Sequence, residues 1–156
     1  MLPSRFARTL MACVVLLISS VPPAVAIPLL LVDAKTLQVL YAEDAGQPWH
    51  PASVTKLMTA YLAFAAIKDG RVSLDTPVKV SQHAWNQAPA KSGLEVGDAV
   101  SLKDALYIML VKSANDMAVA VAETIGGNEK TFVAQMNQMA HDMGLTATHY
   151  DNSNGL

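Results

Sequence analysis

The first apolar segments after the N-terminal region predict two short strands. Residues Ile27 to Val32 form a continuous apolar run, and every second residue from Leu37 to Tyr41 is apolar and lies on one face. Both patterns are typical of strands, and the residues 33–36 between them predict a hairpin turn. Because two strands alone make a marginal sheet, we expect this hairpin to have further partners.

Apolar residues at helical spacing follow the predicted hairpin. They predict a first helix from about Ser53 to Lys68, and Gly70 is expected to end it. Because this helix is apolar over most of its length, we expect it to be central to its domain. The residues expected to face the core are Val54, Leu57, Met58, Tyr61, Leu62 and Ala65.

The segment after the first helix has a mixed pattern. Val78 to Val80 predicts a short strand and Ser81 to Trp85 a short helix. Residues 87–98 contain proline, glycine and serine and predict a loop. Ser101 to Asp104 resembles a capping box, with aspartate in place of glutamate, and opens a helix that ends near Lys112.

Two more helices are predicted towards the end of the sequence. The first covers Ala118 to Ile125 and is stopped by two glycines. Asn128 caps the second, which continues to about Met143, just before Gly144. We interpret its methionines as core residues rather than metal ligands. The residues expected to point inward are Phe132, Val133, Met136, Met139 and Met143.

Residues 1–26 have the pattern of a secretory signal. A start with two arginines precedes a short apolar stretch, Leu10 to Val21, and Ala24 to Ala26 forms an A-x-A cleavage site. Cleavage would leave residues 27–156 as the mature chain, without a disulfide, because the single cysteine is Cys13. The alternative is an uncleaved N-terminal anchor.

Length and charge narrow the range of functions. The chain has 156 residues, an ordinary size for one domain. Its formal net charge of −2 gives no support for nucleic-acid binding. His83, His141 and His149 lack the spacing of metal ligands. We expect neither a metal nor a cofactor.

The candidate chemistry begins with Ser53 and Lys56, which form an S-x-x-K pair. Residues three apart share a helix face, so the lysine nitrogen can reach the serine hydroxyl. A serine becomes a strong nucleophile when a neighbouring base accepts its proton. A lysine can be that base if burial or nearby positive charge lowers its pKa, and a helix N-terminus supplies such positive charge.

A second motif, Ser113-Ala114-Asn115, is predicted at a junction between two helices. S-x-x-K followed by S-x-N is typical of penicillin-binding proteins and related β-lactamases. With Pro-Ala-Ser-Val-Thr-Lys-Leu-Met-Thr at 51–59 and Ser-Ala-Asn-Asp at 113–116, the chain resembles the low-molecular-mass penicillin-binding proteins. More narrowly, it resembles the serine D-alanyl-D-alanine carboxypeptidases.

This resemblance implies an α+β fold of the β-lactamase and DD-peptidase type, a helical cluster on an antiparallel sheet of five strands. The sequence supplies the N-terminal hairpin and most of the helices, and it ends before the strand that carries the family's K-T-G element. Lys91-Ser92-Gly93 has similar chemistry but precedes Ser113, so we assign it no catalytic role. We therefore expect residues 27–156 to be an incomplete catalytic domain with impaired activity.

The resemblance also implies a role for each site residue. Ser53 would be the nucleophile, Lys56 its base, and Ser113 the group that returns a proton to the leaving amine. Asn115 would bind the amide backbone of the substrate and help to hold Lys56. The substrate would be a peptidoglycan stem peptide ending in D-Ala-D-Ala, and β-lactams would acylate the same serine because they mimic that end.

Such an enzyme works outside the bacterial inner membrane, in the periplasm or facing the cell wall. Related proteins often have a further β-rich domain and a C-terminal amphipathic anchor, so membrane association of a full-length protein stays open.

Three other functions also stay open. A class A β-lactamase needs a glutamate-bearing loop that would lie beyond residue 156, although the two motif sequences favour the carboxypeptidase. A class C-like esterase would have a tyrosine where Ser113 stands. A secreted, non-catalytic protein could bind cell-wall peptide without the reaction. The reading frame beyond Leu156 would best separate these possibilities.

Overall fold

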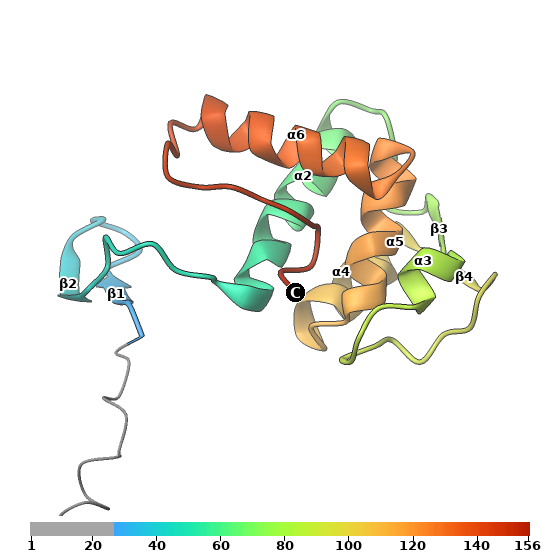
Figure 1. The fold of residues 1–156 in the computed structure, drawn as a ribbon. Coiled ribbons are helices and arrows are strands. Elements are labelled where there is room, and N and C mark those ends of the chain that lie inside the picture. The colour runs from blue at the N-terminus through green and yellow to red at the C-terminus, as the bar shows by residue number, and fades with distance from the viewer. Residues whose placement is uncertain (1–26) are drawn as a thin grey trace, which may run out of the picture. The chain divides into compact units, whose positions relative to one another are not determined.

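The computed structural model describes residues 27–156, which belong to two compact units that divide between Trp49 and His50. The predicted signal segment, residues 1–26, lies outside the described residues. The N-terminal unit contains the strands β1 (Leu29–Val32) and β2 (Val39–Glu43), and the second unit contains all the helices of the described residues (Figure 1). The predicted α+β class is therefore confirmed.

The two strands of the N-terminal unit form the predicted antiparallel hairpin. Leu31 pairs with Tyr41, and the register shifts at the next position, where Val32 pairs with Val39. The second strand begins two residues later than the sequence predicts, because Leu37 belongs to the turn and has a φ of 58°. The Asp33 carboxylate holds this turn by accepting hydrogen bonds from the backbone N–H groups at positions 35 and 36.

The helical unit is built around α5 (Asn115–Gly126), whose first eight residues are all buried. It packs against α2 (Lys56–Lys68), α3 (Gln82–Trp85), α4 (Leu102–Val111) and α6 (Glu129–Asp142). Figure 1 shows α5 in orange among the helices α2, α4 and α6. Its buried stretch is rich in alanine and valine, and small side chains of this kind let neighbouring helices approach closely.

A small second sheet lies in the helical unit, where β3 (Pro77–Lys79) pairs antiparallel with β4 (Ala99–Ser101). The sequence predicts β3 to within one residue. It does not predict β4, because three residues are too few to show an alternating pattern. The loop expected over 87–98 is confirmed, since no helix or strand is found between α3 and β4.

The predicted start of the first helix and part of its core face are wrong. Residues Ala52–Thr55 form a 3₁₀ turn, η1, and the α-helix begins only at Lys56. Met58 and Leu62 are buried as expected, whereas three residues of the predicted face are exposed: Val54 (60%), Leu57 (62%) and Tyr61 (48%). Because this helix is apolar on nearly every side, spacing alone does not select the side that packs.

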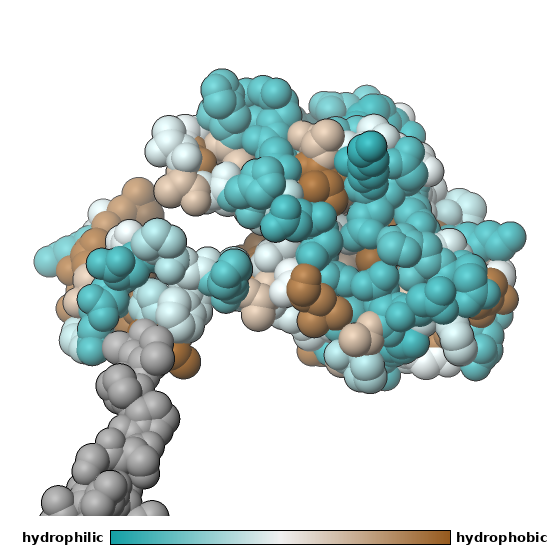
Figure 2. All heavy atoms as spheres, in the orientation of Figure 1, coloured by the Kyte–Doolittle hydropathy of each residue, from teal (hydrophilic) through white to brown (hydrophobic). Residues whose placement is uncertain are grey.

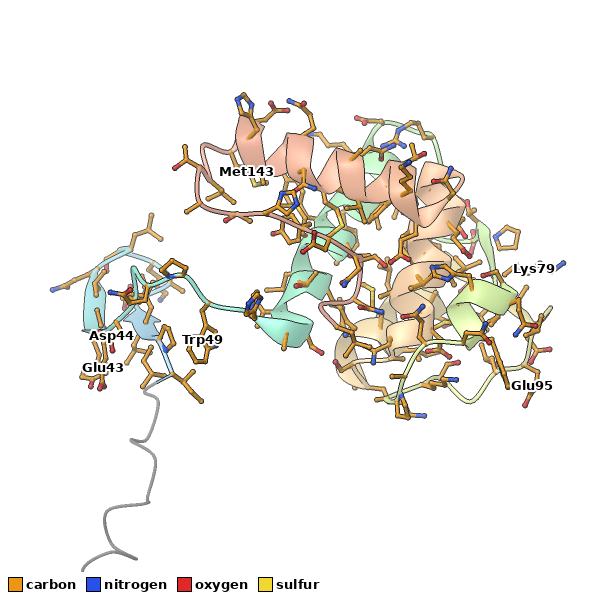
Figure 3. The ribbon with its side chains drawn as sticks, viewed as in Figure 1. Glu43, Asp44, Trp49, Lys79, Glu95 and Met143 are labelled. Atoms are coloured by element: carbon orange, nitrogen blue, oxygen red, sulfur yellow. The ribbon has the colours of Figure 1, made fainter. Side chains whose placement is uncertain are left out.

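The helix caps follow the sequence closely. The Ser101 hydroxyl accepts a hydrogen bond from the Asp104 N–H at the start of α4, and Asn128 does the same for the Thr131 N–H at the start of α6. Such caps satisfy backbone donors that the first helical turn leaves free. At the end of α6, Met143 is 40% exposed rather than inward as predicted (Figure 3).

The core of the helical unit fixes α6 against α2 and α5. Met58 and Leu62 of α2 share a buried cluster with Ala122 of α5. The members from α6 are Phe132, Met136 and Ala140. On the face drawn in Figure 2, hydrophilic residues cover most of this unit and apolar ones gather in small patches. Among residues 27–156, no helix combines the length and apolar character needed to span a bilayer.

Candidate active site

Ser53 and Lys56 lie in contact where η1 passes into α2. The Lys56 Nζ donates a hydrogen bond of 2.9 Å to the Ser53 Oγ. The 3₁₀ turn keeps the contact that the sequence predicts for an α-helical turn, because residues three apart also face the same side of a 3₁₀-helix. Ser53 is exposed, whereas Lys56 is only 2% exposed. The hydroxyl is therefore accessible and the amine beside it is shielded.

The amine of Lys56 has one further partner in the described part of the chain. It donates a 2.9 Å hydrogen bond to the backbone carbonyl of Asn154. Both acceptors are neutral oxygens, and burial lowers the pKa of Lys56. Removing an amine from water disfavours its charged form. Within residues 27–156 no carboxylate is hydrogen-bonded to the Lys56 amine to oppose this effect. Burial, one of the two causes expected from the sequence, therefore acts at Lys56.

Ser113 lies between α4 and α5, at the helix junction predicted from the sequence. Together with Ser53 and Lys56 it lines a cleft of about 300 Å³. Its φ of 59° is in the left-handed region, which costs a residue other than glycine on the order of 1–3 kcal/mol. Ser113 therefore has a strained backbone conformation at the junction between α4 and α5.

Asn115 is the first residue of α5 and is 3% exposed. Its backbone N–H donates to the Ala90 carbonyl (2.8 Å), and its Nδ2 donates to the Ala88 carbonyl (3.0 Å). Its Oδ1 is buried and has no hydrogen-bond partner among the described residues. Contrary to the sequence-based expectation, the described partners of Lys56 do not include Asn115.

The Lys91-Ser92-Gly93 segment has a structural position. The backbone N–H and the hydroxyl of Ser92 both donate to the buried Asp116 carboxylate, at 2.9 and 2.5 Å. The Lys91 amine lies 4.7 Å from the centre of the Trp85 ring. These contacts hold the 88–92 loop over the start of α5, and thereby place the two carbonyls that fix Asn115.

The last residues of the chain belong to the site, although the sequence did not predict it. Besides the Asn154 carbonyl, the Ser153 carbonyl accepts a 2.7 Å hydrogen bond from the Thr59 Oγ1. Gly155 has a φ of 85°, and a β-carbon there would overlap the carbonyl of Ala52, the residue before Ser53. A glycine within a polar, turn-like run was the one available signal, since backbone carbonyls have no residue signature.

Among the described residues, no cluster of three His, Cys, Asp or Glu side chains is arranged to bind a metal. The chemistry that the site supports is that of a serine beside a buried amine, with a second serine across the same cleft.

Comparison with known proteins agrees with this description. Residues 18–156 match the D-alanyl-D-alanine carboxypeptidase family, the Peptidase S11 family, and the chain belongs to it. The D-alanyl-D-alanine carboxypeptidase DacF of Bacillus subtilis is 36% identical over 126 residues, which are 81% of this chain and 32% of the relative. The chain spans about a third of the length of the curated relatives it matches.

Solved structures show the same fold. The D-alanyl-D-alanine carboxypeptidase DacD from Francisella tularensis superposes with a TM-score of 0.78 at 33% identity, over 87% of this chain and 34% of that one. Penicillin binding protein 6B from Escherichia coli gives a TM-score of 0.75 at 36% identity, over 88% of this chain and 46% of the other.

Proposed function

We propose that this chain is the nucleophile-bearing part of a penicillin-sensitive, serine-type D-Ala-D-Ala carboxypeptidase that acts on peptidoglycan stem peptides. The observation that carries the proposal is the 2.9 Å contact between the exposed Ser53 hydroxyl and the buried Lys56 amine. The family to which the chain belongs supplies the substrate class.

The first half of the reaction forms an acyl-enzyme. The Ser53 Oγ bonds to the carbonyl carbon between the two D-alanines, and its proton passes to the neutral Lys56 amine. Because burial lowers the pKa of Lys56, more of the amine is neutral near pH 7 than in an exposed lysine. The Ser53 backbone N–H would act as one oxyanion donor.

The leaving group departs through the second serine. The carbon–nitrogen bond breaks, and the proton held by Lys56 reaches the leaving D-alanine nitrogen through the Ser113 hydroxyl, which lines the same cleft. In the second half, a water oxygen bonds to the acyl carbon as the ester bond to Ser53 breaks. The water's proton returns to the Ser53 oxygen, so the enzyme is restored.

Asn115 is the proposed substrate-binding residue. Its Oδ1 is buried without a partner in the described part of the chain, and such an oxygen costs about 1–3 kcal/mol until it accepts a hydrogen bond. A substrate amide N–H is the complementary donor. The Ala88 and Ala90 carbonyls already bind its side-chain and backbone nitrogens, so the Oδ1 is the polar group of Asn115 that is left for a substrate.

We also propose that residues 1–26 are a signal peptide and that residues 27–156 belong to a catalytic domain that works in the periplasm or facing the cell wall. Both proposals rest on the sequence pattern, since the signal segment lies outside the described residues.

Covalent labelling with a fluorescent penicillin tests the nucleophile. The protein is expressed at full length from its own gene, with any sequence that follows Leu156. We expect Ser53→Ala to abolish labelling, because no other hydroxyl is hydrogen-bonded to the Lys56 amine in the described part of the chain. Lys56→Ala is expected to cost nearly as much, since residues that act as a unit are strongly non-additive. Ser73→Ala, which removes an exposed hydroxyl of a surface turn, is the control. Labelling that survives Ser53→Ala would show that the nucleophile is a different residue.

The same assay separates the carboxypeptidase from two of the alternatives. A carboxypeptidase of this kind keeps the label for long periods, a β-lactamase releases it rapidly, and a non-catalytic binding protein acquires none.

A further inference from the structure

A hydrogen-bonded path leads from α6 to the backbone that contacts Lys56. It begins at Glu129, the first residue of α6, whose side chain is 16% exposed. The Oε1 of Glu129 accepts hydrogen bonds from the Ser153 N–H (3.0 Å) and from the Ser153 Oγ (2.6 Å). Its Oε2 lies 2.6 Å from the Nε2 of His83, the second residue of α3.

Ser153 transmits this contact to the site. It is fully buried, and its carbonyl accepts the hydrogen bond from Thr59 on α2. The next residue, Asn154, supplies the carbonyl that contacts Lys56. Ser153 is therefore held by Glu129 of α6 through its N–H and hydroxyl, and by Thr59 of α2 through its carbonyl.

We propose that Glu129 is a positioning residue for Lys56: it fixes Ser153 so that the Asn154 carbonyl stays on the Lys56 amine and the tail of residues 152–156 keeps water away from it. This proposal rests on the proposed function, because it assigns Lys56 a catalytic task.

The charge of Glu129 suits this role. Burial by itself would raise the pKa of Glu129, but the hydrogen bonds from Ser153 and His83 outweigh burial and lower the pKa below its usual range. The carboxylate is therefore ionised at neutral pH. Hydrogen bonds to an ionised acceptor are roughly twice as strong as neutral ones, so Glu129 holds the tail more firmly than a neutral acceptor would.

Loss of Glu129 has a predictable effect on Lys56. Without its acceptor the Ser153 backbone detaches, and water reaches an amine that is now 2% exposed. Water replaces the Asn154 carbonyl as a hydrogen-bond acceptor, so the net change is the loss of burial. Because burial is what lowers the pKa of Lys56, its pKa rises. Acylation needs the neutral amine, so the acidic limb of its pH profile moves to higher pH.

The other charged groups nearby leave this reasoning intact. The elements packed against α2 are η1, α4, α5 and α6. Asp116 of α5 is bonded to Ser92, and Lys112 at the end of α4 donates to the Ser92 carbonyl. Asp104 of α4 is bonded to Ser101, and η1 has no charged residue before Lys56. In the described structure none of these groups bonds to the Lys56 amine.

The remaining charged residues of these helices, which likewise make no hydrogen bond to Lys56 in the described structure, are Lys103, Glu123, Lys130, His141 and Asp142.

The test measures the rate constant for acylation of Ser53 by a fluorescent penicillin from pH 5 to pH 9, in the protein expressed from its own reading frame. Glu129→Ala should move the acidic limb to higher pH, and a limb that lies one pH unit higher means acylation about tenfold slower at each pH along it. Glu129→Gln keeps an amide oxygen for Ser153 and should restore most of the profile. Glu123→Ala is the matched control, since Glu123 lines the same surface hollow of about 450 Å³ as Glu129 but makes no hydrogen bond to the tail.

An unchanged pH profile in Glu129→Ala would overturn the proposal. It would also be overturned if the variant gave less folded protein but the folded fraction kept the acidic limb at the wild-type pH. If Glu129→Ala does not fold, Ser153→Ala decides, because it removes only the hydroxyl bond: a smaller displacement of the limb in the same direction supports the proposal and an unchanged limb refutes it. Absence of wild-type labelling at Ser53 would instead refute the proposed function, so the two failures are distinguishable.

Discussion

Gly155 is the position where the smallest change should have a large and specific effect. Its φ of 85° lies in the left-handed region, and a β-carbon there would overlap the Ala52 carbonyl and approach the Thr55 hydroxyl. Gly155→Ala should therefore cost about 1–2 kcal/mol for the backbone conformation. Overlap with the packed turn should add about 1–3 kcal/mol.

Gly127→Ala is the matched control, because Gly127 has a similar φ of 78° but open space around its α-carbon. It should have the backbone cost alone, so the difference between the two variants measures the close approach. We expect urea unfolding to place Gly155→Ala about 1–3 kcal/mol below Gly127→Ala in stability.

Gly155→Ala should also slow acylation by penicillin, because the displaced turn carries Ser53. A displacement of about 1 Å costs on the order of a hundredfold in rate. Gly127→Ala should acylate at the wild-type rate, since the end of α5 is remote in sequence from the turn. Equal stability of the two variants, together with wild-type acylation by Gly155→Ala, would refute the idea that the tail packs tightly against the turn that carries Ser53.

Two further predictions concern the loop over α5 and the start of the chain. Asp116→Ala should destabilise the protein by about 1–3 kcal/mol in urea unfolding, because it leaves the Ser92 N–H without its acceptor. Ser92→Ala should destabilise it less. An Asp116→Ala variant as stable as wild type would contradict this prediction. N-terminal sequencing of exported protein should begin at Ile27, and an intact Met1 would rule out cleavage after Ala26.

Local features of this fold could be predicted because they depend on residues close in sequence. The Ser101 and Asn128 caps are examples, since each side chain bonds to an N–H three residues away. The contact between Ser53 and Lys56 is another, and it survives the change from an α-helical to a 3₁₀ turn. In each case the spacing alone brings the groups together.

The missed features depend on distant parts of the chain. The Asn154 carbonyl meets Lys56 across 98 positions of sequence, and a backbone oxygen is present at every residue, so nothing marks this one. The exposed side of α2, with Leu57 at 62% exposure, could not be told from its buried side because both are apolar. In both cases the result depends on which distant segments pack together, and the local sequence does not show this.

In the proposed arrangement, a carboxylate can position Lys56 without raising its pKa, because it does not bond to the amine directly. An acidic group bonded directly to the amine would favour the charged form and raise the pKa of Lys56, so less of the neutral amine that the proposed function needs would be present. The two acceptors in the structure are neutral, and the carboxylate of Glu129 reaches the amine only through Ser153 and Asn154. Its charge is taken up by the Ser153 N–H and hydroxyl and by His83. The fold thus uses a strong charged anchor for the tail while the lysine itself remains among neutral oxygens.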